Sequence, residues 1–194
     1  IDSLLAGNTH YMPSSGTLEA REAIATKLRT ENNIDCTQAN ISINAGAKMT
    51  LNLALMSILD PGKNQEVVVP TPVWVSYKPM IELAGGSMVE VPTTVESHFK
   101  CTPEELEAAI TPNTKAIMLN SPSNPCGTMY SPEETRAIAN MLERHPDIYV
   151  LSDEIYERLI YSDIEHLSFG AIPEIAHQVI TINGLSKAFA MTVW

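Results

Sequence analysis

Short runs of apolar and β-branched residues alternate along the chain with segments of helical periodicity. Several of these runs are almost continuously apolar, which is typical of strands that are covered on both faces. They predict five clear strands and, from a shorter run, one more before them. The predicted strands are Ile41–Ile43, Glu66–Val69, Met88–Val91, Lys115–Leu119, Ile148–Leu151 and Gln178–Ile182.

Helix starts lie between the predicted strands. Thr102 and Ser131 are each followed by Pro-Glu-Glu, which places a hydroxyl at the N-cap, a proline at the first helical position and a glutamate at the third. Further helices are predicted at Leu18–Glu31, Lys48–Leu59 and Trp74–Ala84. The alternation predicts an α/β fold in which helices sandwich a mostly parallel sheet. Such sheets bind ligands beyond the carboxyl ends of their strands, so the residues after each strand are candidates for function.

Composition narrows the class of protein. The chain has 194 residues, 44% of them hydrophobic, which suits one globular domain with a sizeable core. A net charge of -11 argues against nucleic acid or an anionic membrane as a partner. No apolar run reaches the roughly 18 residues of a membrane span, and the first residues do not resemble a signal peptide, so we expect a cytoplasmic protein. The cysteines, Cys36, Cys101 and Cys126, are widely spaced, which predicts reduced thiols and no metal site.

Two charged residues follow the last two predicted strands. Asp153 comes just after Ile148–Leu151, where an aspartate is usually a helix cap or a solvated loop residue. Lys187 follows Gln178–Ile182 and is flanked by small and apolar residues on both sides. A lone lysine is most often a surface residue. This setting can nevertheless desolvate an amine and lower its pKa, which favours Schiff-base chemistry.

Three further segments offer groups for binding. The loop Asn120–Gly127 contains two prolines and a glycine, so it is either an ordinary turn or a rigid mount for the amide of Asn124. Small residues at Gly46 and Ala47 leave backbone N–H groups free at a predicted helix start, a weak motif for a phosphate. Trp74 is either core packing or a flat wall on which a ring stacks.

Together and in this order, these elements resemble the class I and II aminotransferases, which use pyridoxal 5′-phosphate (PLP). The match is most specific at Asn120–Gly127, at Ser152–Tyr156 and at Ser186–Thr192. The resemblance extends over essentially the whole chain and is nearest to the aspartate-aminotransferase-like branch. It implies the large domain of a PLP-dependent transferase and an enzyme of amino-acid metabolism that moves an amino group between an amino acid, with aspartate as the leading candidate, and a 2-oxo acid.

The resemblance also implies roles for individual residues. Lys187 would form the covalent bond with PLP and then move the α-proton of the substrate. Asp153 would pair with the protonated pyridine nitrogen, where an ionised carboxylate keeps the ring an electron sink. Asn124 and Tyr156 would hydrogen-bond the phenolic oxygen of PLP. Trp74 would stack on the ring, and Trp74 and Asn124 would also contact the substrate.

The phosphate of PLP would lie against backbone amides around Gly46 and Ala47, with Ser186 as a further contact. The tyrosine that matches Tyr11 reaches the cofactor phosphate of a neighbouring subunit, which implies a homodimer. Lys48 stands where relatives often have glutamine or glutamate, and it either adds charge near the phosphate or faces solvent.

We expect the chain to be part of a longer protein. It opens at Ile1 and ends at Val193-Trp194 within an apolar stretch. Related enzymes supply a later arginine for the cofactor phosphate and another for the substrate carboxylate. Residues 1–194 would therefore be an incomplete PLP-binding large domain, without an N-terminal segment and the C-terminal small domain. A PLP-dependent lyase of related fold and a truncated, non-catalytic remnant remain as alternatives.

Overall fold

The computed structural model describes residues 1–192, so Val193 and Trp194 lie outside the described residues. The chain forms two compact units, and the boundary between them lies between Asn44 and Ala45. Among the described residues, no helix has the length and apolar character needed to cross a membrane.

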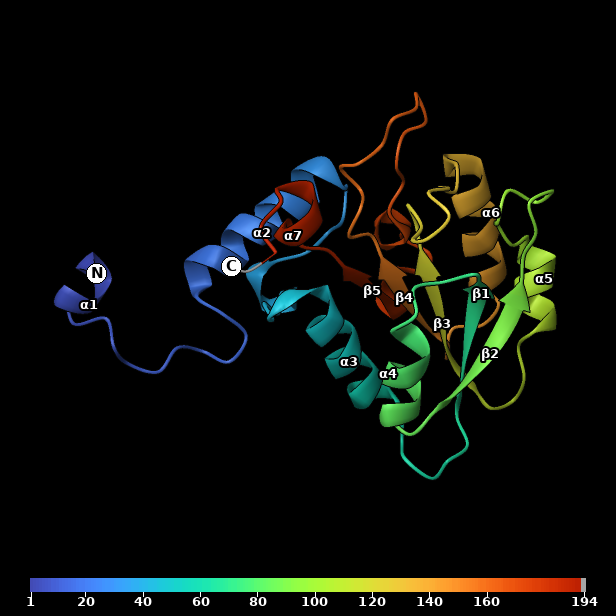
Figure 1. The fold of residues 1–194 in the computed structure, drawn as a ribbon, viewed down its shortest axis with the longest axis horizontal. Helices are drawn as coiled ribbons and strands as arrows, with labels where there is room; N and C mark the ends of the chain where they lie inside the picture. The colour runs from blue at the N-terminus through green and yellow to red at the C-terminus, as the bar shows by residue number, and fades with distance from the viewer. Residues whose placement is uncertain (193–194) are drawn as a thin grey trace. The chain divides into compact units, whose positions relative to one another are not determined.

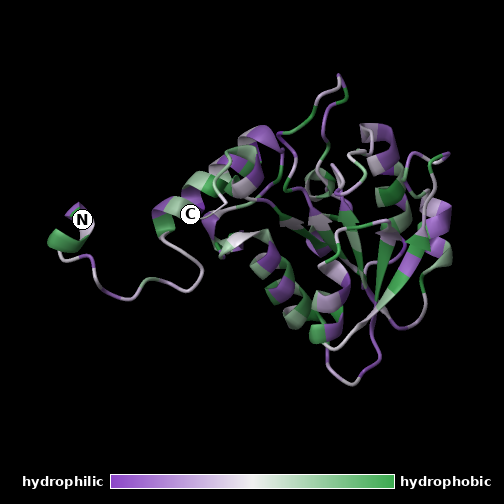
Figure 2. Ribbon diagram, viewed as in Figure 1, coloured by the Kyte–Doolittle hydropathy of each residue, from purple (hydrophilic) through white to green (hydrophobic). Residues whose placement is uncertain are grey.

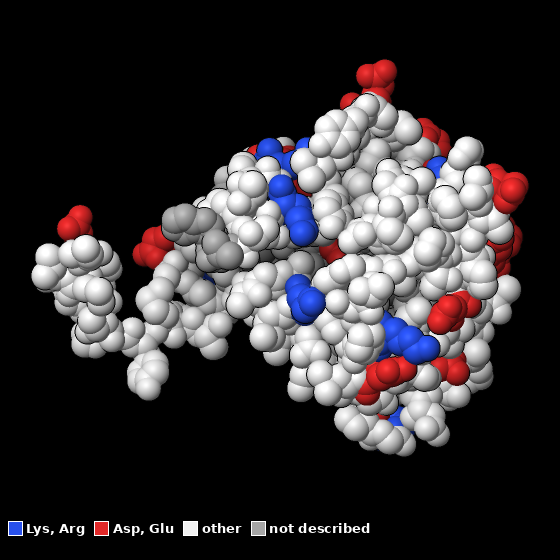
Figure 3. Space-filling view, in the orientation of Figure 1, with Lys and Arg blue, Asp and Glu red and all other residues white. Residues whose placement is uncertain are grey.

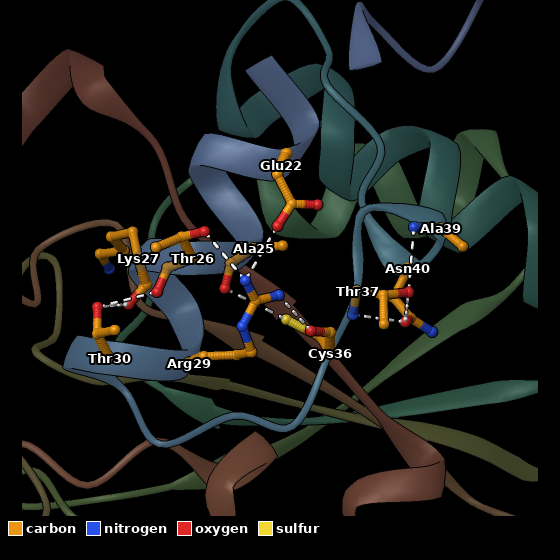
Figure 4. Close-up of polar contacts among 10 residues, drawn as sticks. All are labelled: Glu22, Ala25, Thr26, Lys27, Arg29, Thr30, Cys36, Thr37, Ala39 and Asn40. Carbon is orange, nitrogen blue, oxygen red and sulfur yellow. Dashed lines mark hydrogen bonds and ion pairs between the residues drawn. The ribbon is translucent and has the colours of Figure 1, made fainter. Parts of the chain in front are cut away.

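The first unit, residues 1–44, contains two α-helices and a short 3₁₀ helix. These are α1 (Asp2–Leu5), α2 (Leu18–Glu31) and η1 (Gln38–Asn40). The bounds of α2 are those that the sequence predicts. Arg29 fixes the return of the chain beside α2, because its Nη1 donates to the carbonyl oxygen of Cys36 at 2.8 Å (Figure 4). Ala25, Leu28 and Cys36 form the small apolar cluster of this unit.

The predicted strand Ile41–Ile43 does not form. The segment is extended, but its only backbone hydrogen bond to another segment of this unit runs from the N–H of Ile43 to the carbonyl oxygen of Ser15, at 3.0 Å. A single bond of this kind does not build a strand ladder, because a ladder needs a partner strand that continues in register.

The second unit, residues 45–194, is built on a five-stranded sheet in which every pairing is parallel (Figure 1). The strand order is β2-β1-β3-β4-β5. All five predicted strands of this unit are confirmed, most with one or two residues added at an end. They are β1 (Glu66–Thr71), β2 (Ser87–Pro92), β3 (Thr114–Asn120), β4 (Tyr149–Asp153) and β5 (Val179–Ile182).

Helices cover both faces of this sheet, and the side chains of the strands alternate between them. One core joins Val68 and Ile117 to helices α5 (Pro103–Ala108) and α6 (Pro132–Leu142). The other joins Val67 and Met118 to helices α3 (Gly46–Ile58) and α4 (Tyr77–Leu83). Figure 2 shows the apolar residues concentrated in the strands between these helices. The remaining elements are η2 (Phe169–Ala171), η3 (Ala176–Gln178) and α7 (Leu185–Ala188).

Local chemistry explains where the helices of this unit begin. The capping boxes expected at Thr102 and Ser131 are both present, with Glu105 and Glu134 as the reciprocal glutamates. Helix α4 begins at Tyr77 and not at the predicted Trp74. Pro79 has no N–H to donate, and a start at Tyr77 leaves that gap in the first turn, where no intrahelical bond is lost.

Candidate active site

Polar residues gather at the carboxyl edge of the sheet, where β3, β4 and β5 end side by side. Asn120, the last residue of β3, is in register with Asp153, the last residue of β4. Asp153 is in turn in register with Ile182, the last residue of β5. Parallel strands end at the same edge, so this register brings three loops together at one place.

Asp153 is a buried carboxylate at the centre of this edge. Its side chain belongs to the last strand residue, not to the loop that the sequence predicts, and the residue is only 3% exposed. Its Oδ2 accepts a hydrogen bond from the hydroxyl of Tyr77 at 2.5 Å, and its Oδ1 accepts one from the backbone N–H of Ile155 at 3.3 Å. Among residues 1–192, no lysine, arginine or histidine forms an ion pair with it.

Burial raises the pKa of Asp153, because the charged form loses its hydration. The hydrogen bonds from Tyr77 and Ile155 oppose that shift, and the nearby Glu154 adds to it. The net direction is upward. Asp153 is therefore a carboxylate whose charge the described residues solvate only in part, at the sheet edge where this fold class binds ligands.

Asn120 connects Asp153 to the loop after β3. Its Nδ2 donates to the backbone oxygen of Asp153 at 2.9 Å, and its Oδ1 accepts from the backbone N–H of Asn124 at 2.7 Å. One amide group thus fixes two neighbouring main-chain segments. No motif in the sequence points to Asn120 by itself, although this residue ends β3, at the sheet edge where parallel sheets bind ligands.

Asn124 and Tyr156 are brought together from different loops. The Nδ2 of Asn124 lies 3.4 Å from the hydroxyl of Tyr156, which accepts from it. Both side chains are partly buried. The tyrosine hydroxyl keeps its own proton for donation, so the pair can offer donors to one acceptor atom of a ligand.

Lys187 lies in α7, on a segment that runs beside the chain after β4. The N–H of Glu154 donates to the carbonyl oxygen of Ile182 at 2.8 Å. A Cβ placed on Gly184 would lie 2.9 Å from Cδ1 of Ile155, which shows how closely the two segments approach. Further on, the guanidinium carbon of Arg158 lies 5.5 Å from the ring centroid of Phe189.

The side chain of Lys187 is exposed, and no described residue forms a hydrogen bond or ion pair with its amine. The small and apolar residues that flank it therefore do not bury it, contrary to the desolvation that the sequence suggests. Leu185 and Phe189 are themselves 58% and 53% exposed. Ser186 is partly buried in the same helix.

Gly46 and Ala47 form the start of α3. Ala45 at the N-cap offers no side-chain acceptor, so this residue caps none of the first N–H groups of the helix. Gly46 has a φ of +83°, and a Cβ there would meet nothing within 4 Å. The helix therefore begins with available donors and open space, as an anion site requires.

Trp74 contacts both Tyr77, which donates to Asp153, and Lys48 in the first turn of α3. Its ring meets that of Tyr77 edge to face, with centroids 5.7 Å apart. Lys48 is exposed, and its amine lies 4.9 Å from the centroid of the Trp74 ring in a cation–π contact that the sequence did not predict. Tyr11 belongs to the first unit and is fully exposed, so its contact with the cofactor phosphate stays a prediction.

A second buried acid, Glu154, anchors the loop after β4. Its Oε1 accepts from the hydroxyls of Ser152 and Ser168, each at 2.8 Å, and its Oε2 lies 3.1 Å from Nε2 of His166. A carboxylate oxygen of Glu154, a carboxylate oxygen of Glu157 and a ring nitrogen of His166 lie within 4.8 Å of one another. The carboxylate is already satisfied by its protein partners, so the cluster acts as an internal brace for the loop. No sequence motif predicts this cluster, because His166 lies 12 positions after Glu154.

This arrangement is that of an α/β protein whose candidate site is assembled from strand ends on a parallel sheet. The sequence model of the family described as aminotransferase class I and II matches residues 4–194, and the chain belongs to that family.

Several relatives are similar over nearly the whole chain. It is 43% identical over 195 residues to the aspartate aminotransferase of Bacillus subtilis, covering 100% of this chain and 49% of the relative. It is 41% identical over 194 residues to a Petunia hybrida bifunctional aspartate aminotransferase and glutamate/aspartate-prephenate aminotransferase, covering 100% and 40%. The solved structure of Thermus thermophilus aspartate aminotransferase with maleate matches with a TM-score of 0.92 and 44% identity, covering 100% and 49%. The chain thus spans about half the length of these proteins.

Asn120→Ala tests the connection between the two loops. The variant leaves the N–H of Asn124 without its partner, while the carbonyl oxygen of Asp153 keeps the bond from the N–H of Ser121 at 3.2 Å. We therefore expect the free energy of unfolding to fall by about 1–3 kcal/mol. Urea denaturation measures this change. Asn140→Ala, at an exposed position of α6, is the matched control and should stay within about 0.5 kcal/mol of wild type. An equal effect of both substitutions would contradict the role given to Asn120.

The raised pKa of Asp153 predicts a pH-dependent stability difference in the cofactor-free protein. The folded protein binds the carboxyl proton of Asp153 more tightly than the unfolded chain does, so ionisation of Asp153 lowers the free energy of unfolding. This loss of stability is present at neutral pH. It disappears as the pH falls toward 3.8, the ordinary pKa of an aspartate. Asp153→Asn removes this loss of stability. We therefore expect its free energy of unfolding, relative to wild type, to be most favourable at pH 7 and to decline as the pH is lowered. Asp147→Asn, at an exposed position, should show no such trend, and the prediction fails if the two variants behave alike.

Proposed function

We propose that the complete protein is a PLP-dependent aminotransferase that transfers an amino group between an amino acid and a 2-oxo acid. The observation that carries the proposal is the buried carboxylate of Asp153, which has no cationic partner among the described residues and lies at the carboxyl edge of the sheet. The relatives support aspartate as one substrate, since the Bacillus subtilis, Petunia hybrida and Thermus thermophilus proteins are all named aspartate aminotransferases.

The residues present fit PLP. A protonated ring nitrogen would supply the cation that Asp153 lacks. Asn124 and Tyr156 would donate to the phenolic oxygen, and Trp74 would cover one face of the ring. The phosphate would lie at the uncapped start of α3, against the amides of Gly46 and Ala47, with Ser186 as a further contact.

Lys187 would bind the cofactor covalently through Nζ. Its amine is exposed and has no partner among the described residues, so no protein contact has to break before it reacts. When bound, PLP supplies an electron sink that stabilises negative charge at the substrate Cα.

The chain's own groups would do the rest of the work. The Asp153 carboxylate would hold positive charge at the ring nitrogen, and that charge would keep the electron sink effective. Once the amino group of the substrate has displaced it, the Nζ of Lys187 would take the proton from Cα and would donate that proton back on completing the transfer. Asn124 and Trp74 orient the substrate, so that the bond to be broken faces that amine.

We also propose that residues 1–194 make up most of the large, cofactor-binding domain, and that the protein works as a homodimer in which Tyr11 reaches the cofactor phosphate of the second subunit. Helix α3, which carries the proposed phosphate site, supports a dimer because it leaves a row of apolar side chains uncovered. Met49, Leu53 and Met56 are 44%, 42% and 57% exposed on one side of this helix.

Reduction with borohydride tests the role of Lys187. In the PLP-loaded complete protein, we expect peptide mapping to find the reduced cofactor on Lys187, because only the amine that forms the covalent bond is trapped. Lys187→Ala should abolish labelling, whereas Lys78→Ala, at an exposed position of α4, should retain it. Label on a different lysine in the wild-type protein would refute the assignment.

The dimer has its own test. Leu53→Glu places a charge in the exposed row of α3, so it should weaken self-association of the complete protein in sedimentation equilibrium. Leu83→Glu, at the 75% exposed end of α4, should leave the association unchanged. A wild-type protein that sediments as a monomer would contradict the proposal.

A further inference from the structure

Tyr77 is a buried polar residue that has no role in the proposed reaction. It lies 76 positions before Asp153 in the sequence, and its hydroxyl makes the short bond to Oδ2 of that residue. The residue is 0% exposed, and its ring belongs to the core that α3 and α4 form against the sheet, where Leu51, Leu55 and Ile81 are also fully buried. Packing therefore fixes the ring, and the ring fixes the place of the hydroxyl.

The two bonds to the Asp153 carboxylate hold it from different elements. The hydroxyl of Tyr77 approaches Oδ2 from α4, and the N–H of Ile155 approaches Oδ1 from the chain that follows β4. A carboxylate that receives one donor on each oxygen cannot turn about its Cβ–Cγ bond without losing both bonds, and each oxygen keeps a further lone pair for a ligand.

The direction of the Tyr77 bond is also fixed. Burial raises the pKa of Tyr77 well above 10, and the charge of Asp153 raises it further. The hydroxyl therefore keeps its proton throughout the range in which an enzyme of this kind works, and it acts as the donor. The bond favours the ionised form of Asp153, against the upward pull of burial on the pKa of that carboxyl.

Tyr77 also connects the carboxylate to Trp74. The two rings meet at 85° with centroids 5.7 Å apart, and Trp74 is the residue proposed to cover the cofactor ring. One buried side chain thus contacts both the group assigned to the ring nitrogen and the group assigned to the ring face.

From these contacts we propose that Tyr77 is a positioning residue for the reaction: its hydroxyl holds the Asp153 carboxylate oriented and ionised for the pyridinium nitrogen of PLP. The proposal rests on the proposed function for its consequence in catalysis. Its physical core, a hydroxyl that favours the anion of Asp153, does not depend on the cofactor.

Tyr77→Phe in the complete protein tests it, because phenylalanine keeps the packed ring and removes only the hydroxyl. In the cofactor-free protein, with the aspartate carboxyl carbons labelled with ¹³C, we expect the pKa of Asp153 to rise above its wild-type value. In the loaded protein we expect kcat to fall about tenfold, with a smaller change in KM, since the lost bond supports charge that matters most during proton transfer.

Tyr130→Phe is the matched control. Tyr130 is also buried, and its hydroxyl accepts from the N–H of Cys101, away from Asp153. This variant loses a buried hydroxyl too, so a purely structural effect would appear in both. We expect it to leave the pKa of Asp153 and the ratio of kcat to KM as in wild type.

An unchanged Asp153 titration in Tyr77→Phe would overturn the proposal, whatever happens to activity. If the titration shifts but the wild-type protein takes up no PLP on Lys187, the proposed function fails while the contact stands. If Tyr77→Phe does not fold, NMR of the wild-type protein tests the contact. A Tyr77 hydroxyl proton that exchanges slowly with water and shows a nuclear Overhauser effect to Asp153 supports it. A hydroxyl proton that exchanges as fast as those of exposed tyrosines refutes it.

Discussion

The charge on Asp153 is the constraint around which the rest of the site is arranged. A carboxylate that leaves water needs donors or a cation, and the protein supplies two hydrogen bonds and no cation among the described residues. The remaining electrostatic cost is carried by the folded protein until a positive group arrives. Acidic side chains at the surface do not change the electrostatic cost of the Asp153 charge. On the face in Figure 3 they lie at several separate places, with no single acidic patch. Solvent also screens charges at the surface.

The parallel sheet explains why other groups converge on that carboxylate. Asn120, Asp153 and Ile182 end three adjacent strands in register, so the loops after β3, β4 and β5 leave the sheet together. Asn120 then fixes the first loop against the second, and the Glu154 brace fixes the second loop against its own continuation. Helices on both faces bury the strands, and that burial gives Tyr77 from α4 a fixed position beside Asp153.

Much of this could be predicted from sequence, and the omissions have physical reasons. Strands show as apolar runs and helix starts as capping residues, so the five-stranded parallel sheet and the helices were within reach. Asp153, Asn124, Tyr156 and Lys187 carried a family resemblance. Tyr77 did not stand out, because a tyrosine in an apolar helix looks like core packing and its partner is distant in sequence. The absence of a strand at Ile41–Ile43 and the exposure of Lys187 depend on which neighbours cover a segment, and local pattern does not encode that.

The most direct test of the account is the protonation state of the cofactor ring nitrogen in the complete protein. With PLP labelled with ¹⁵N in the ring, the nitrogen chemical shift should report a protonated nitrogen at neutral pH in the wild-type protein, and an unprotonated nitrogen in Asp153→Asn. A ring nitrogen that carries no proton in the wild-type protein would contradict the pairing of that nitrogen with Asp153, and the account of the site would fail with it.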